Sequence, residues 1–319
     1  MRTATNSPAS GGWSEDILTS NAPPETPIVE NLIYPGLGVV AGPPKAGKTN
    51  FGFQLASAVA QGVPLFEGFE SVAGKVLYIA LEEMPSLTAS RFAKMGVSLP
   101  PQSVYVEYTF PPLSRGGATH IGNFIATNPE TKLVVVDVLQ RLRGHTGKSS
   151  YRADYQELTS LHRLGNESGA AIVLLHHTTK KVQANWQASI YGTQGLAAAA
   201  DTAILLDRPD LSEKGRLCVT GRKCATREWL VEFHPETLTW SMVGEVKATD
   251  LTPERRAILE ALADTCGGFL TPRQLAQETS LGNKSIFNIL DKLRESGLVE
   301  KAKRGRYQLT AVGLKALKG

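Results

Sequence analysis

The sequence predicts an α/β fold, in which a mostly parallel β-sheet is flanked by helices, followed by a small C-terminal domain. Short, mainly apolar runs at 37–41, 76–81, 132–137 and 170–175 predict strands, and amphipathic helical patterns separate them. The centre of each run is apolar at consecutive positions, which is typical of strands buried on both faces of a parallel sheet. Residues 251–319 instead show helical periodicity and form a separate unit.

Length and composition exclude several classes of protein. A chain of 319 residues suits one large domain and one small domain. No apolar run reaches the roughly 18 residues of a membrane span, and the first residues lack the apolar core of a signal peptide. The three cysteines, Cys218, Cys224 and Cys266, are odd in number and are not spaced as metal ligands. We therefore expect a cytoplasmic protein that has no disulfide and does not cross a membrane.

The net charge of +4 is distributed unevenly. Residues 251–319 contain 12 Lys and Arg against 7 Asp and Glu, a net of +5, which leaves −1 for all residues before them. A basic C-terminal domain favours an acidic partner such as DNA.

Residues 1–30 are expected to form a flexible N-terminal arm, because they are rich in Ser, Thr, Asn, Pro and Gly. Trp13 is one of the few apolar residues in this arm. A lone exposed aromatic side chain can anchor an interface, so the alternative is that Trp13 docks on an adjacent subunit.

The first predicted strand leads directly into a glycine-rich turn ending in Lys48-Thr49, and an amphipathic helix follows at once. This is the pattern of a P-loop, in which loop N–H groups and a helix N-terminus surround the phosphates of a nucleotide. Lys48 is expected to reach the β- and γ-phosphates, and Thr49 to ligate Mg²⁺. The expected ATP-binding residues are Gly42, Pro43, Pro44, Lys45, Ala46, Gly47, Lys48, Thr49 and Asn50.

Acidic residues end two other predicted strands. Asp137 follows four apolar residues, which is the form of a Walker B strand whose aspartate holds Mg²⁺ through water. Residue 138 is Val, so the general base must come from elsewhere, and Glu82 is the first candidate, with Glu83 second. The alternative for this pair is the solvated first turn of the following helix, favoured by the helix dipole.

A polar cluster follows the strand predicted at 170–175. His177 is expected to sense the γ-phosphate, because ligands of open α/β sheets bind beyond the carboxyl ends of the strands. His176 is expected to lie in the core or behind the site, and a metal site is not expected without further ligands. Further on, Arg222 and Lys223 occupy a turn between two predicted antiparallel strands, which could be a solvated hairpin.

Residues 31–240 resemble the RecA-like ATPases, in particular the group that includes plasmid RepA-type hexameric replicative helicases and their phage and prophage relatives. The resemblance covers about two thirds of the chain, and its motifs are in the right order. They are NLIYPGLGVVAGPPKAGKT, GKVLYIALEE with Arg91 following, LVVVDVLQRLRG, the helix after Asp154, IVLLHHTTK and GTQGLAAAADTAILLDR. It implies a ring, usually a hexamer, with ATP between subunits and with Arg222 or Lys223 acting as an arginine finger in a neighbour's site. Lys45 departs from the pattern, since a small residue is more usual there; it either adds a phosphate contact or points to solvent.

Residues 251–319 resemble a winged helix-turn-helix domain, with three short helices before a hairpin at 298–309. The third helix would expose Lys284 and Asn288 to DNA base edges. The hairpin would present Arg304 and Arg306 to phosphates or the minor groove. Winged helices also dock on proteins, and that alternative stays open.

Together these features predict an ATP-hydrolysing, DNA-associated motor, a hexameric replicative-type helicase of a mobile element or prophage. In a ring, the polar loop at 180–195 would face the central channel, where Lys180 and Lys181 would contact single-stranded DNA. The alternatives are a DNA-bound regulator and a recombination or repair mediator, neither of which unwinds DNA. The expected cofactors are ATP and Mg²⁺, and the expected partners are DNA and further copies of the chain.

Overall fold

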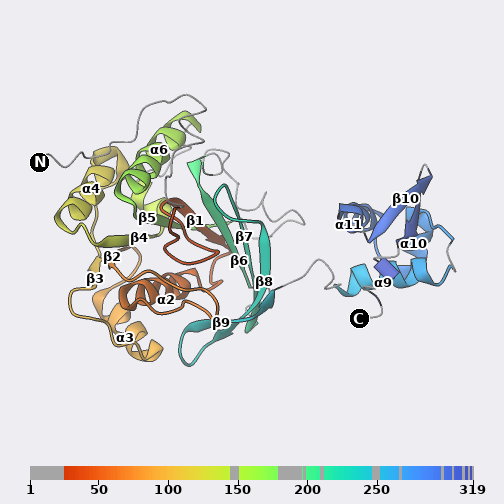
Figure 1. The fold of residues 1–319 in the computed structure, drawn as a ribbon, viewed down its shortest axis with the longest axis horizontal. Helices are drawn as coiled ribbons and strands as arrows, with labels where there is room; N and C mark the ends of the chain where they lie inside the picture. The colour runs from red at the N-terminus through yellow and green to blue at the C-terminus, as the bar shows by residue number, and fades with distance from the viewer. Residues whose placement is uncertain are drawn as a thin grey trace, which may run out of the picture.

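The computed structural model describes residues 25–143, 151–178, 196, 199–208, 212–245, 252–265, 268–295, 298–303, 305–310, 313–314 and 317. Among them, a nine-stranded sheet forms the centre of the large domain, in the order β3-β2-β4-β5-β1-β6-β7-β8-β9 (Figure 1). Its strands are β1 (Gly36–Gly42), β2 (Lys75–Ala80), β3 (Val104–Glu107), β4 (Thr131–Asp137), β5 (Ala171–His177), β6 (Thr202–Asp207), β7 (Lys214–Gly221), β8 (Arg227–His234) and β9 (Thr239–Glu245).

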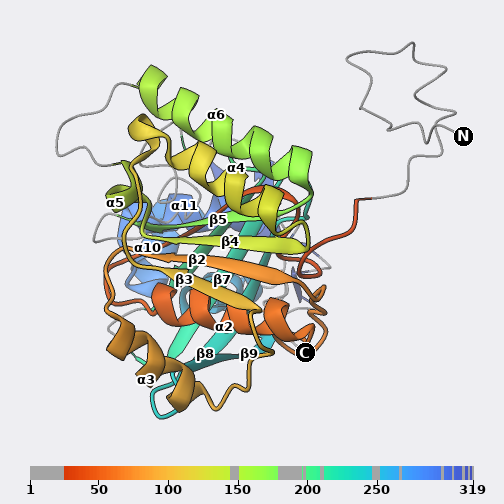
Figure 2. The ribbon, with the colours of Figure 1, turned by 90° about the vertical axis from the view of Figure 1, so that its left-hand side faces the viewer.

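Neighbouring strands are parallel from β3 to β6 and antiparallel from β6 to β9. Helices α2 and α3 cover one face of the sheet, and α4 and α6 cover the other (Figure 2). The mostly parallel sheet flanked by helices, predicted from the sequence, is confirmed. The helices are α2 (Lys48–Gln61), α3 (Pro85–Met95), α4 (Gly117–Thr127), α5 (Leu139–Arg143) and α6 (Tyr151–Ser168), with a 3-10 turn, η1 (Leu113–Arg115).

The two layers of helices explain why the strands are apolar at consecutive positions. In β2, Tyr78 belongs to the apolar cluster that includes α2, while Leu77 and Ile79 belong to the cluster that includes α4 and α6. All three side chains are fully buried. Burying a large apolar side chain contributes about 1.5–3 kcal/mol, so both faces of the strand stabilise the fold.

The strand register places the predicted motifs at one edge of the sheet. Strand β1 lies between β5 and β6, and Gly42 pairs with His177. On the next pair of strands, Ala80 pairs with Asp137. The carboxyl ends of β1, β2, β4 and β5 therefore meet at this edge. Strand β5 extends two residues beyond the predicted run because β1 continues to Gly42 and pairs with both histidines.

The flexible N-terminal arm was predicted over residues 1–30, but the last residues of this range belong to the large domain. Ile28 and Val29 are 3% and 0% exposed and belong to the core of the large domain. Val29 also forms isolated bridges with Ile33 and Ser71. The apolar side chains of this segment fill the core, so the boundary expected between residues 30 and 31 lies too late in the chain.

The C-terminal domain contains α9 (Pro253–Ala263), α10 (Pro272–Thr279), α11 (Asn283–Glu295), β10 (Val299–Lys303) and β11 (Arg306–Leu309). Strands β10 and β11 form an antiparallel hairpin, and Leu270 bridges to Tyr307 beside it. Helix α10 begins with a capping box, in which the Thr271 side chain accepts from the backbone N–H of Gln274. The apolar stripes of the three helices pack with the hairpin in a separate core.

None of the helices in the described part of the chain has the length and apolar character needed to cross a membrane.

Candidate functional site

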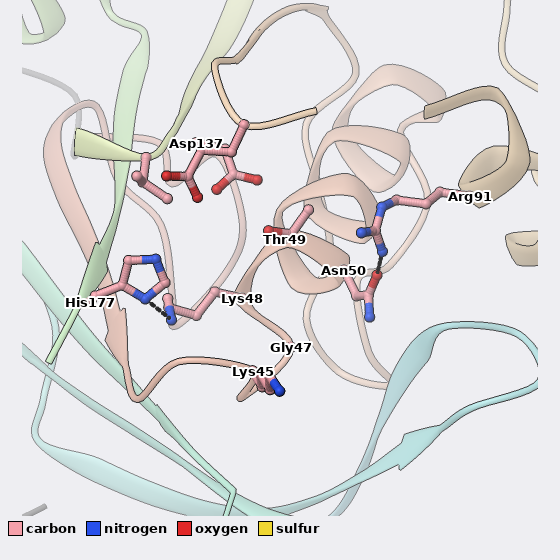
Figure 3. A pocket seen from close by; sticks show the side chains of 10 residues that line it. Lys45, Gly47, Lys48, Thr49, Asn50, Arg91, Asp137 and His177 are labelled. Atoms are coloured by element: carbon pink, nitrogen blue, oxygen red, sulfur yellow. Dashed lines mark hydrogen bonds between the residues drawn. The ribbon is translucent and has the colours of Figure 1, made fainter. Parts of the chain in front are cut away.

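A cavity of about 200 Å³ lies at the edge of the sheet where the strand ends meet (Figure 3). It draws residues from the β1–α2 loop, from the carboxyl ends of β2, β4 and β5, and from α3. Its lining residues are Lys45, Gly47, Lys48, Thr49, Asn50, Glu82, Arg91, Asp137, Val138 and His177. The structure thus brings together candidates from four separate sequence motifs.

The loop between β1 and α2 has the conformation that its glycines permit. Gly47 caps α2 with φ 94°, a left-handed conformation that favours glycine. A Cβ atom there would lie 2.9 Å from the ring of Trp240, whose Nε1–H donates to the Gly47 carbonyl at 3.3 Å. At Gly42, a Cβ atom would lie 2.3 Å from the Leu206 carbonyl oxygen. Lys45 also has a positive φ of 65° and is exposed.

Lys48 extends back across the loop and is only 4% exposed. Its ammonium donates to the carbonyls of Gly42 and Pro43, each at 2.9 Å, and lies 3.0 Å from Nδ1 of His177 (Figure 3). Burial lowers the pKa of Lys48 to about 8, against the opposing effects of Asp137 and Glu82. An ammonium can only donate, so Nδ1 of His177 accepts and the ring proton lies on Nε2.

Both histidines at the end of β5 are neutral at physiological pH. Burial lowers the pKa of His176 to about 4, with further lowering from Arg143. Burial also lowers the pKa of His177, and the neighbouring Lys48 adds to this effect. His177 lines the cavity, whereas His176 does not.

Asp137 is 2% exposed at the end of β4. Burial raises the pKa of its carboxyl to about 6, while hydrogen bonds from the Thr49 and Tyr78 hydroxyls oppose this increase. The Tyr78 hydroxyl donates to Oδ2 of Asp137 at 3.1 Å. A hydroxyl and a carboxylate side by side are the oxygen ligands that Mg²⁺ prefers, so these residues fit the metal that a P-loop protein uses.

The adjacent carboxylates after β2 have different surroundings. Glu82 lines the cavity and its side chain is 43% exposed, with Nε of Arg141 at 3.4 Å from Oε1. Glu83 is 6% exposed and accepts from Nε of Arg91 at 2.6 Å and from the Thr88 hydroxyl at 3.4 Å. Only the first of the two carboxylates faces the cavity.

The sequence predicted no role at the site for Arg91, Tyr78 or Trp240. Arg91 links Glu83 to Asn50 at the start of α2, where its guanidinium donates to the amide oxygen (Figure 3). These contacts depend on which elements lie side by side, which residue spacing does not reveal. The available signals were a tyrosine in an otherwise aliphatic strand and an arginine in the helix after the glutamate pair.

Arg222 and Lys223 lie at the opposite edge of the sheet, because Gly221 pairs with Thr202, the first residue of β6. The Lys223 ammonium lies 2.7 Å from a Glu25 carboxylate oxygen, 2.7 Å from the Pro35 carbonyl and 3.1 Å from the Asn166 amide oxygen. The Arg222 side chain is 61% exposed and lies 4.0 Å from Asp201. Neither residue reaches the cavity of its own chain.

The predicted DNA-contacting residues are only partly within the described structure. Lys284 and Asn288 are both exposed on α11. The Arg306 guanidinium lies over the Phe269 ring, 4.7 Å from its centroid, which holds the side chain at the surface. Lys180, Lys181 and Arg304 lie outside the described residues.

Two comparisons with known proteins agree with this geometry. The pattern of the AAA domain family matches residues 4–183, which is more than half of the chain. Among solved structures, a DnaB-like replicative helicase, described together with its interactions with primase, is similar with a TM-score of 0.52 and 13% sequence identity. The match covers 66% of this chain and 57% of the helicase chain. At this identity the similarity shows a shared RecA-like fold.

Proposed function

The chain belongs to the AAA domain family, and we propose that it is a P-loop enzyme that hydrolyses ATP and acts as a DNA-associated motor. More specifically, we propose a hexameric replicative-type helicase of a mobile element or prophage. The observation that carries the proposal is the gathering of Lys48, Glu82, Asp137 and His177 around one cavity. The sheet that holds this cavity has a fold shared with a replicative helicase.

The P-loop is proposed to bind the ATP phosphates through its N–H groups and Lys48. In the structure, Lys48 donates to two carbonyls and to His177. A phosphate oxygen carries more negative charge than these acceptors, so phosphate binding would draw Lys48 into the cavity. His177 would then lose its contact with Lys48 and become available to the γ-phosphate, as a sensor must.

Glu82 is proposed as the general base that activates water. Its side chain lines the cavity and is partly exposed, so water can reach its carboxylate. Glu83 is proposed to be structural, because its carboxylate is held by Arg91. Mg²⁺, held by Thr49 and Asp137, would neutralise charge on the phosphates. Asp137 is buried within hydrogen-bond contact of the Thr49 and Tyr78 hydroxyls.

A ring of subunits is proposed to complete the site. Within one chain Arg222 and Lys223 are at the edge of the sheet opposite the cavity, so either residue can act only on a neighbour's nucleotide. The three oxygen contacts of Lys223 hold its ammonium within its own chain. Arg222, whose side chain is 61% exposed, is the stronger candidate for the arginine finger.

DNA contact is proposed at two places. The order of three helices and a hairpin supports a winged helix in which Lys284, Asn288 and Arg306 contact duplex DNA. Arg304 is proposed to contact phosphates or the minor groove. Lys180 and Lys181 are proposed to contact a single strand in the channel of the ring.

ATP hydrolysis measured with and without DNA tests the proposed function. We expect single-stranded DNA to stimulate hydrolysis, and the stimulation to weaken as salt rises, because phosphate contacts release counterions. The Glu82→Gln variant should bind the same DNA without hydrolysing ATP. A rate that neither single-stranded nor duplex DNA changes at low salt would contradict the proposal.

A further inference from the structure

Tyr78 is a fully buried tyrosine in the middle of β2. Its ring stacks on Phe53 of α2 with centroids 4.1 Å apart and planes 9° from parallel. Its hydroxyl donates to Oδ2 of Asp137, on the neighbouring strand β4. The tyrosine therefore connects the helix that follows the P-loop with the aspartate at the rim of the cavity.

The space around this hydroxyl is limited by α2. A Cβ atom at Gly52 would lie 2.9 Å from the Tyr78 hydroxyl oxygen and 3.1 Å from Cδ1 of Leu175. Glycine inside a helix is about 1 kcal/mol less favourable than alanine. The close approach of the hydroxyl explains why position 52 nevertheless carries no side chain.

We propose that Tyr78 is a positioning residue that fixes the plane of the Asp137 carboxylate toward the magnesium site, and that Gly52 preserves the room for its hydroxyl. The terminal torsion of an aspartate side chain is soft, so the carboxylate takes the orientation that its hydrogen-bond donors impose. Two donors act on Asp137: Thr49 from the P-loop and Tyr78 from the core. The inference rests on the proposed role of Asp137 in holding Mg²⁺.

Binding of ADP, measured by calorimetry with Mg²⁺ and with EDTA, tests this role without relying on activity. In Tyr78→Phe the ring stack remains and only the hydroxyl is lost. We expect its ADP affinity in EDTA to stay within about twofold of the wild type, and the gain from Mg²⁺ to fall about tenfold, as for other partners of metal ligands. Tyr105→Phe, an exposed tyrosine in β3, is the matched control and should behave as the wild type.

Gly52→Ala, a substitution on α2, should also reduce the gain in ADP affinity from Mg²⁺, because its methyl group displaces the Tyr78 hydroxyl. In the double variant the hydroxyl is absent and the contact with Cδ1 of Leu175 at 3.1 Å remains, so Gly52→Ala should add little to the loss of the Mg²⁺ gain that Tyr78→Phe already shows. Thermal unfolding without nucleotide confirms that each variant is folded.

Two results would overturn the inference. A folded Tyr78→Phe protein with the wild-type gain from Mg²⁺ would show that the hydroxyl only satisfies a buried carboxylate. A wild-type protein whose ADP affinity is the same with Mg²⁺ and with EDTA would refute the magnesium role of Asp137 itself, and with it the role of Tyr78.

Discussion

Two neighbouring glutamates illustrate how surroundings assign different roles to one type of side chain. Glu82 opens onto the cavity, whereas Glu83 is nearly buried against Arg91 and Thr88. A general base needs access to water, and an ion pair inside the protein needs its partner. The structure therefore separates a proposed catalytic residue from a proposed structural one at adjacent positions.

Glutamine substitutions should separate these two roles. Glu82→Gln should bind ATP normally and hydrolyse it about 10²–10⁴-fold more slowly, because the base is lost while the phosphate contacts remain. Glu83→Gln should instead lower the free energy of unfolding by about 1–3 kcal/mol, because Arg91 loses its charged partner. Steady-state hydrolysis, ATP binding and urea unfolding measure these effects. Normal hydrolysis by Glu82→Gln, together with its loss in Glu83→Gln, would reverse the assignment.

His176 predicts a pH dependence of stability. Its pKa is about 4 in the folded protein against an ordinary value of 6.5, so the unfolded chain binds more protons between these values. The free energy of unfolding should fall as pH decreases from about 6.5 to about 4, and the total loss is at most about 3 kcal/mol. His176→Asn should not show this loss.

The measurement is the difference between the urea-unfolding curves of the wild type and His176→Asn across this pH range. The raised pKa of Asp137 has the opposite effect on stability, but it is present in both proteins and cancels. His120→Asn, at a side chain that is 46% exposed, is the control. If the unfolding free energies of the wild type and His176→Asn differ by the same amount at every pH, the lowered pKa of His176 is contradicted.

At the scale of elements, the edge strand β9 contacts α2, the helix that follows the P-loop. The Gln54 side chain on α2 bonds both backbone groups of Trp240 on β9: its oxygen accepts from the N–H at 2.7 Å, and its nitrogen donates to the carbonyl at 2.9 Å. The Trp240 ring in turn closes over Gly47. Strand β9 therefore supports the loop that is proposed to hold the phosphates.

Gln54→Leu should remove this connection while keeping the size of the side chain. Both backbone groups of the buried Trp240 would lose their partner, so we expect a loss of roughly 2–4 kcal/mol in unfolding free energy. Gln61→Leu is the matched control, since Gln61 lies on the same helix and, within the described residues, its side chain donates to the Ser57 carbonyl alone. Urea unfolding compares them, and equal stabilities of the two variants would contradict the proposed connection.

The elements of the sheet were predictable because strands buried on both faces leave a continuous apolar signal, as in β2 and β4. The gathering of Lys48, Asp137 and His177 followed from motifs at carboxyl strand ends. The contacts of Tyr78 and Trp240 were not predictable, because they depend on strand order and on how the antiparallel strands close over α2. Periodicity reports which side chains are buried, but not what they face.

At the scale of the whole molecule, the proposed ring divides each active site between two subunits. Arg222 lies at the edge of the sheet opposite its own cavity. Arg222→Ala should therefore bind ATP but hydrolyse it at least about 10³-fold more slowly, as other arginine fingers do.

Mixing Arg222→Ala with Glu82→Gln tests whether sites are shared. A hybrid interface can combine the intact Glu82 of one subunit with the intact Arg222 of its neighbour, so the mixture should hydrolyse ATP faster than either variant alone. No gain at any mixing ratio would show that each subunit acts on its own nucleotide.

Strand displacement on a forked DNA duplex tests most directly whether hydrolysis at this cavity drives movement along DNA. The wild-type protein with ATP and Mg²⁺ should release the displaced strand, and Glu82→Gln under the same conditions should bind the fork without releasing it. Rapid, DNA-stimulated hydrolysis by the wild type with no strand released would contradict the helicase assignment and favour an ATP-controlled DNA-binding regulator.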